Sequence, residues 1–440
     1  MFGSAASHDA CAPLVTRYLC GFLLFFSSVF VLPVCAQNAP MLQLSDARAR
    51  AMGNNPGLAM MRERYAALTH IAPQVSSLPD PVLSLNALNL PWDNFDLHQE
   101  PMTQLQLGIS QTFPFPGKLV LNEEIAVFEA EVAAYSVEEM RLNLDMNVTV
   151  TWWDIFYLDR AIETVLKNQA VFRQLVGVAN KKYEVGEGLQ QDVLLAQLEL
   201  SKLLDTEIQL KAIREQRVIR LNVLMDTSPA MPEKLPSSMP VFSGLLAPHT
   251  ILYRRAEEAR PLLQGEQSMI DASQSRLALA EKSYYPDFKV GLAYGNREKD
   301  QLGQSRQDFV SIMLSVNIPL YAGTRQSQSV KQQRRELARS RYSLLDQKNL
   351  VFSSIATAIT EYQQASAQMV LYEGGIVPQA RQTVESMLAG YRVNQVDFLS
   401  LAGSQTTLLN SELLYWKSFS EIHQSIARLT AAVGEDKIYE

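Results

Sequence analysis

The chain has 440 residues, a formal net charge of −7 and charges of both signs spread along its length. It contains no basic stripe, which argues against a protein that binds nucleic acid. Glycine and proline number 20 each, too few for a disordered or collagen-like chain. The length suits two or three ordinary domains or one elongated molecule.

The N-terminus predicts export from the cytoplasm. Arg17 precedes an apolar run over 18–34, and Cys35 and Ala36 follow it. A basic residue, an apolar core and a small-residue site are typical of a secretory signal peptide, here 1–36. Two alternatives remain open, an uncleaved membrane anchor and an N-terminus lipidated at Cys35. All three cysteines lie in this leader, so the mature chain would form no disulfide.

The first repeat is expected over 37–226. A helical start breaks at Asn55-Pro56, and the hydrophobic period then changes to two. This alternation predicts strands at about 82–90 and 103–113, joined by a polar, proline-flanked loop. Each strand has one apolar and one polar face, and its length of roughly 10 residues is enough to cross a bilayer when tilted. The same pattern is also compatible with a half-buried hairpin of a soluble sheet.

Long helices fill the rest of this repeat. Residues 118–182 contain no proline and one glycine, so they predict a helix of roughly 100 Å if it is continuous. A reversal at 183–192 follows, and 189–226 predict a returning helix. Helices of this length exceed the width of a globular domain and must belong to a coiled coil or a rod-like bundle.

The second repeat follows a connector rich in proline over 227–249. Residues 250–440 have the same order of elements, and Pro378 is expected to break or kink the long helix. The expected elements are a helix at about 250–284, strands at about 288–296 and 309–320, a long helix over 324–390, a reversal at 391–399 and a return over 396–433.

Two pairs of landmarks show that the repeats are copies. Tyr391 lies 208 positions after Tyr183, and each tyrosine opens a Tyr-x-Val segment. Pro286-Asp287 follows Pro79-Asp80 at an offset of 207. The chain therefore contains one half-structure twice.

Four strands cannot close a barrel, and an open sheet would leave unpaired edges that lipid does not tolerate. If the strands are membrane strands, closure requires several copies of the chain. Two copies give eight strands and a barrel nearly filled by side chains, whereas three give twelve strands and a water-filled bore. The predicted fold is mainly α with a small β-barrel portion, in two tandem repeats, and a trimer is favoured.

The chain resembles the TolC-like outer-membrane efflux proteins over essentially its whole mature length. The resemblance rests on the start LSDARARAMGNNPGL, the two hairpins, the repeated Tyr-x-Val reversal and the following Asp-Val-Leu-x-Ala-Gln. It implies a homotrimer with a 12-stranded barrel in the outer membrane of a Gram-negative bacterium and a helical tunnel through the periplasm. It also implies a periplasmic membrane-fusion adaptor and an inner-membrane pump. Segments 78–86 and 111–118 look most like outer-membrane parts of resistance-nodulation-division pumps that export heavy-metal cations.

The resemblance makes the two reversals the periplasmic tips. The residues it implies for adaptor docking are Tyr183, Val185, Gly186, Glu187, Tyr391, Val393, Asn394 and Gln395. Asn394 replaces the usual glycine and is expected to keep the turn because asparagine tolerates a left-handed backbone.

Related channels often narrow the tunnel with aspartates after the second tip. Here Ser400 and Gly403 occupy those places, so that ring is not carried over. The nearby charges, and so the candidate gate, are Asp192, Arg392 and Asp397. A salt bridge between helices and plain solvated charges are equally compatible with these residues.

No motif for catalysis or for a resident metal or cofactor is legible. The chain has no phosphate-cradling glycine loop, no CxxC and no HExxH. Met52, Met60 and Met61 could contact a soft metal, but helix packing is the favoured interpretation. We therefore expect a conduit, not an enzyme, and no role in binding nucleic acid. The alternatives are a drug-efflux or type I protein-secretion duct of the same fold, and a soluble periplasmic coiled-coil scaffold.

Overall fold

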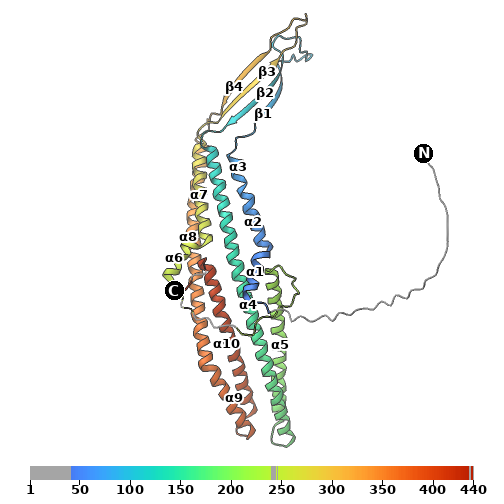
Figure 1. Ribbon diagram of the computed structural model, residues 1–440, viewed down its shortest axis with the longest axis vertical. Coiled ribbons are helices and arrows are strands. Elements are labelled where there is room, and N and C mark those ends of the chain that lie inside the picture. The colour runs from blue at the N-terminus through green and yellow to red at the C-terminus, as the bar shows by residue number, and fades with distance from the viewer. Residues whose placement is uncertain (1–40, 239–243, 245, 436–437, 440) are drawn as a thin grey trace, which may run out of the picture. The chain divides into compact units, whose positions relative to one another are not determined.

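A computed structural model describes residues 41–440, except 239–243, 245, 436–437 and 440. The predicted signal peptide and the candidate lipidation site at Cys35 lie outside the described residues. Residues 41–440 form one structural unit, in which a small sheet lies at one end of a set of long helices (Figure 1).

Three short helices begin this unit. Asn55 separates the first two, because its backbone is extended and its side chain accepts a hydrogen bond from the Leu58 N–H at 3.1 Å. Pro56 follows in the first helical turn, where a missing N–H is tolerated. The helices are α1 (Leu44–Asn54), α2 (Pro56–Thr69) and α3 (Ile71–Ser76).

The four strands form one antiparallel sheet in chain order. The two hairpins lie side by side, because β2 pairs with β3 although the whole first helical section separates them in sequence. The first and last strands each have one strand neighbour, so both edges of the sheet are open. The strands are β1 (Val82–Leu88), β2 (Gln104–Phe113), β3 (Phe288–Asn296) and β4 (Phe309–Val316).

The register gives the sheet one apolar and one polar face. Cross-strand rows on the apolar face are Leu83, Ile109, Leu292 and Ile312, and Leu85, Leu107, Tyr294 and Val310. Leu85 and Ile312 are each 80% exposed, so no other described residues cover this face. The opposite face includes Ser84, Gly108, Ala293 and Ser311. The alternation of apolar and polar residues therefore identified the two faces of the sheet.

Two strands end earlier than the alternation predicts. β1 stops at Leu88 instead of residue 90, because Asn89 turns to a positive φ of 55° and leaves the extended conformation. β4 stops at Val316 instead of residue 320. Val316 pairs with Phe288, the first residue of β3, so the partner strand ends there. Alternation alone cannot detect the end of a partner strand.

The first repeat continues into two long helices. α4 (Lys118–Glu184) is one continuous helix of 67 residues, which spans about 100 Å at 1.5 Å per residue. The chain then reverses, and α5 (Gln190–Leu224) packs back along α4. The reversal lies at the end of the unit opposite the sheet (Figure 1).

The second repeat contains a break that the sequence analysis did not predict. Instead of one helix at about 250–284, the chain forms α6 (His249–Ala259) and α7 (Pro261–Lys282). Pro261 begins α7, and Arg260 before it adopts an extended backbone with ψ 116°. Proline disfavours the helical conformation of its preceding residue, which explains the break at Arg260.

A break or kink was expected at Pro378, but the second long helix continues through it. A π-helical turn, η1 (Tyr372–Ile376), joins α8 (Gln326–Leu371) to α9 (Val377–Arg392) without leaving the helical region. Pro378 lies in the first turn of α9, and the wider turn before it removes the need for a break. α10 (Phe398–Val433) then returns beside α9 and α8.

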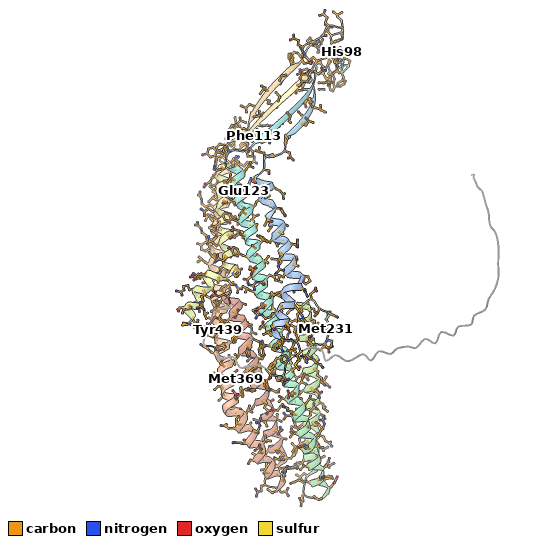
Figure 2. The ribbon with its side chains drawn as sticks, in the orientation of Figure 1. His98, Phe113, Glu123, Met231, Met369 and Tyr439 are labelled. Atoms are coloured by element: carbon orange, nitrogen blue, oxygen red, sulfur yellow. The ribbon has the colours of Figure 1, made fainter. Side chains whose placement is uncertain are left out.

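Packing between helices from both repeats holds the unit together. α4 contacts α5, α7 and α10, and α8 contacts α7 and α10. The largest core cluster includes Trp152, Trp153 and Phe156 of α4 with Phe419 of α10. In Figure 2, Phe113 lies where the sheet meets the helices and His98 lies beyond the far ends of the strands. The sheet and the two reversals therefore occupy opposite ends of one helical body.

Candidate docking and gating site at the two helix reversals

The first reversal is built by a left-handed residue that closes the end of α4. Gly186 has φ 77°, and its N–H donates to the Tyr183 carbonyl at 3.0 Å. The Glu187 N–H donates to the Lys182 carbonyl at 2.8 Å. These two bonds satisfy helix carbonyls that otherwise have no partner, in the arrangement of a Schellman motif.

The second reversal repeats the same bonds with asparagine in the left-handed place. Asn394 has φ 61°, and its N–H donates to the Tyr391 carbonyl at 3.3 Å. The Gln395 N–H donates to the Gly390 carbonyl at 2.9 Å. The turn thus forms without the glycine, as the sequence analysis expected.

The two equivalent tyrosines lie in different environments. Tyr183 is 48% exposed, whereas Tyr391 is 4% exposed and its ring packs edge-on against Phe398 with centroids 5.6 Å apart. Tyr391 belongs to a core cluster with Phe172 of α4 and Leu401 of α10. Sequence reasoning treated the two tyrosines alike, but the structure assigns one to the surface and the other to the core.

The remaining candidate docking residues are mostly on the surface. Val185 is 69% exposed and Val393 is 64% exposed. Gly186, Glu187, Asn394 and Gln395 are also exposed in the described chain. Leu189 and Leu399 are exposed nearby, at 60% and 67%, so both tips present apolar side chains that could contact another protein.

Lys182 joins the two reversals, although sequence reasoning overlooked it. Its ammonium donates to the Tyr391 carbonyl at 2.5 Å and also bonds the Asn394 carboxamide oxygen. It lies 4.6 Å from the centre of the Tyr391 ring, and the residue is 9% exposed. The one available signal was the polar residue at position 394, whose side chain accepts this bond where glycine could not.

A cavity of about 410 Å³ lies between the two reversals. Lys182, Tyr391 and Asn394 line it together with two candidate gate residues, Asp192 and Asp397. The third candidate, Arg392, is exposed and does not line the cavity. Within the described residues, no ion pair joins Arg392 to Asp192.

Burial and like charge act on the carboxylate of Asp192. Burial raises the pKa of Asp192, and the charge of Asp397 adds to this, while the Tyr391 hydroxyl and Lys182 oppose it. Burial, and then the charge of Asp192, raise the pKa of the Tyr391 hydroxyl to about 12. That hydroxyl faces Asp192 without a hydrogen bond of good geometry.

Asp397 has a structural role at the start of α10. Its carboxylate accepts the Ser400 N–H at 2.7 Å and the Ser400 hydroxyl at 3.1 Å. These bonds, which cap the helix, lower the pKa of Asp397. Its charge is therefore stabilised locally, while the charge of Asp192 is not.

Other parts of the described chain offer little chemistry. Within those residues, no group of three or more His, Cys, Asp or Glu side chains could hold a metal ion. Across the same residues, no helix combines the length and apolar character needed to cross a membrane. Met52 and Met61 pack against the largest core cluster, whereas Met60 is 65% exposed. The structure therefore supports helix packing for two of these three methionines.

Known proteins share both sequence and fold with this chain. Residues 252–435 match the family described as outer membrane efflux protein. The outer membrane efflux protein BepC of Brucella suis biovar 1 (strain 1330) is 22% identical over 315 residues, which cover 70% of this chain and 68% of BepC.

Two solved structures share the fold at low sequence identity. The outer membrane protein VceC from Vibrio cholerae is similar with a TM-score of 0.76 and 18% identity, over 89% of this chain and 96% of VceC. The outer-membrane channel OprN is similar with a TM-score of 0.75 and 17% identity, over 89% of each chain.

Proposed function

We propose that the chain is an outer-membrane efflux channel of the TolC-like family and the exit duct of a tripartite pump. The family match over residues 252–435, the similarity to BepC and the fold of the described residues support this proposal. It acts as a homotrimer, with twelve strands in the outer membrane and the helices extending through the periplasm. It is a conduit, and the inner-membrane partner supplies the energy.

The open, one-sided sheet is the observation that carries this proposal. An apolar face with side chains up to 80% exposed and two open edges would be unstable in water. In lipid the apolar face is satisfied, and the edges are satisfied only by pairing with further copies. Three copies give a twelve-stranded barrel wide enough for a water-filled bore.

The partners proposed are a periplasmic membrane-fusion adaptor and an inner-membrane resistance-nodulation-division pump. The adaptor contacts the tips through Val185 and Val393, whose exposure supports this role. Asp192, Arg392 and Asp397 form the gate. Asp192 and Asp397 line the cavity, and Arg392 lies outside it on the surface.

The proposed cargo is heavy-metal cations. The support is the resemblance of segments 78–86 and 111–118 to outer-membrane parts of pumps that export such cations. Drug efflux and type I protein secretion are the alternatives with the same fold. The neighbouring genes discriminate between them: an adaptor with a cation pump favours metals, and an adaptor with an ABC transporter favours secretion.

The test is a deletion strain grown on copper, silver, zinc, cobalt and nickel, with an antibiotic panel beside them. We expect the deletion strain to be sensitive to one or more of the metals, and the wild-type gene to restore its resistance. Sensitivity to antibiotics alone would replace the metal cargo with drugs, and an unchanged strain on both panels would contradict an efflux role.

A second experiment tests adaptor docking separately from the cargo. The variant with Val185→Glu and Val393→Glu is expected to reach the membrane but fail to restore resistance, because charge replaces both exposed apolar contacts. Met60→Glu is the matched control, since Met60 is 65% exposed and lies in α2, far from the tips along the chain. Restoration by the double variant would remove Val185 and Val393 from the docking site.

A further inference from the structure

The polar face of the sheet carries a single charge. Lys289 is the one charged residue in the four described strands. It pairs across the sheet with Thr112 and Ser315, so it lies on the polar face, while its neighbour Val290 lies on the apolar face. In a barrel whose apolar face contacts lipid, the Lys289 ammonium projects into the bore.

Lys289 lies at the end of the sheet that joins the helices, beside an acidic residue that is already neutralised. Asp287 accepts a bond from the Lys118 ammonium at 2.8 Å and from the Phe115 N–H at 2.7 Å. Burial opposes the charge of Asp287, but these bonds outweigh burial and lower its pKa. Within the part of the chain that the structure describes, no ion pair involves Lys289, so its charge is not compensated there.

We propose that Lys289 determines the ionic selectivity of the barrel and favours anionic over cationic solutes. The inference rests on the proposed trimer, in which three Lys289 side chains form a ring at one level of the bore. Rings of lysine or arginine select for anions because they raise the local concentration of negative charge and repel positive charge. The ring acts over a Debye length of about 8 Å at physiological ionic strength, so salt weakens it.

The first repeat lacks this charge. The offset of 207 that relates Asp80 to Asp287 places Val82 at the position equivalent to Lys289. Val82 lies on the same polar face, where it pairs with Ser110, and it is 53% exposed. The trimer therefore has three lysines at this level. Replacing the equivalent Val82 by lysine would add three more.

The ring has a clear consequence for a pump with cationic cargo. An electrostatic barrier is the same in both directions, but the pump raises the cation concentration inside the tunnel until outward flux matches delivery. Cations outside the cell have no such drive. The ring therefore reduces passive re-entry through the duct while pumped export continues.

The experiment is the reversal potential of the purified full-length trimer in a planar lipid bilayer under a tenfold KCl gradient. We expect Lys289→Gln to lower the chloride-to-potassium permeability ratio by about twofold, and Lys289→Glu to lower it further. Val82→Lys is expected to raise the ratio by about twofold, because it doubles the ring charge. All differences should shrink in 1 M salt, where the Debye length is about 3 Å.

Lys299→Gln is the matched control. Lys299 is exposed in the loop between β3 and β4, outside the strands, so its loss should leave the ratio unchanged. Equal ratios for wild type, Lys289→Gln and Val82→Lys would overturn the inference and leave the channel intact. Absence of any conductance from the wild-type trimer would instead contradict the proposed function.

Discussion

At the residue scale, the two tips show how one duplicated motif acquires two roles. Gly186 and Asn394 hold the same left-handed backbone, with φ 77° and 61°. Only asparagine has a side chain, and that side chain accepts the bond from Lys182. Tyr183 stays on the surface while Tyr391 enters the core and lies beneath the same ammonium. Lys182 of the first tip thus contacts the second tip, and within the described residues no equivalent contact runs from the second tip to the first.

The first prediction concerns Lys182. Lys182→Met keeps the apolar stem and removes bonds from a charged group worth about 1.5–3 kcal/mol, so the two tips should separate more readily. The expected result is a larger single-channel conductance and greater sensitivity to antibiotics too large for porins. Asn394→Gly should give a smaller effect in the same direction, because it keeps the turn and removes one acceptor. Lys181→Met, at an exposed position, should behave as wild type; equal conductance in all four proteins would show that the contact does not hold the tips.

The second prediction concerns pH and Asp192. Because the folded-state pKa of Asp192 is raised, protonation stabilises the described arrangement, in which Lys182 joins the two tips, and this stabilisation is lost as pH rises through the raised pKa. Conductance should therefore fall on acidification into the range just above the ordinary carboxyl value of 3.8. Asp192→Asn should abolish that step in a conductance–pH titration. A step of unchanged size in the variant would assign the titration to another group.

At the element scale, the long helices of the two repeats differ at the glycine pair of the second repeat. α4 passes without interruption from sheet to tip, whereas α8 and α9 are joined by the π-helical turn with Gly374 and Gly375. Neither glycine has a positive φ, and a Cβ would meet nothing within 4 Å at Gly374 and only Leu371 Cδ1, at 3.9 Å, at Gly375. These glycines are therefore not required by space or by backbone angle.

The third prediction follows from that geometry. The double variant Gly374→Ala and Gly375→Ala should raise stability, because alanine favours a helix over glycine by about 1 kcal/mol at each position. The measurement is thermal unfolding of the trimer in detergent. Gly186→Ala is the matched comparison: its Cβ also meets nothing within 4 Å, but φ 77° makes the substitution strained, so it should destabilise. A double variant less stable than wild type would mean that the π-helical turn itself needs glycine.

At the scale of the whole molecule, the chain is incomplete by itself. Its sheet exposes an apolar face and two edges, while its helices pack into a body with its own core clusters. Large apolar side chains are also exposed along the helices, where Ile208 and Val370 are each 67% exposed. A monomer in water would leave both the apolar face and the edge hydrogen bonds unsatisfied, which is the physical reason to expect several copies to assemble in a membrane.

The fourth prediction tests that assembly. The protein should sediment with outer membranes, resist extraction by salt and leave with detergent as a particle of about three chain masses, as the closure of twelve strands requires. The measurement is light scattering coupled to size exclusion, corrected for bound detergent. Recovery in the soluble fraction without detergent would favour the periplasmic scaffold instead.

Much of the fold was predictable because local patterns dominate it. Period-two alternation identified all four strands and their apolar faces, and the absence of proline over 118–182 predicted the continuous α4. The incorrect predictions concern places where a contact outside the local pattern decides where an element ends or continues. The end of β4 depends on where its partner β3 begins, and the continuity at Pro378 depends on a wider helical turn just before it.

By itself, the sequence determined the duplication, the types of the elements, the two reversals and the left-handed tolerance of position 394, because each depends on residues close along the chain. Only the tertiary structure decided that Lys182 reaches across to Tyr391 and Asn394, 209 and 212 positions away. It also decided that Tyr391 is buried while Tyr183 is not. Contacts between separate helices depend on how those helices pack, and no local pattern encodes that packing.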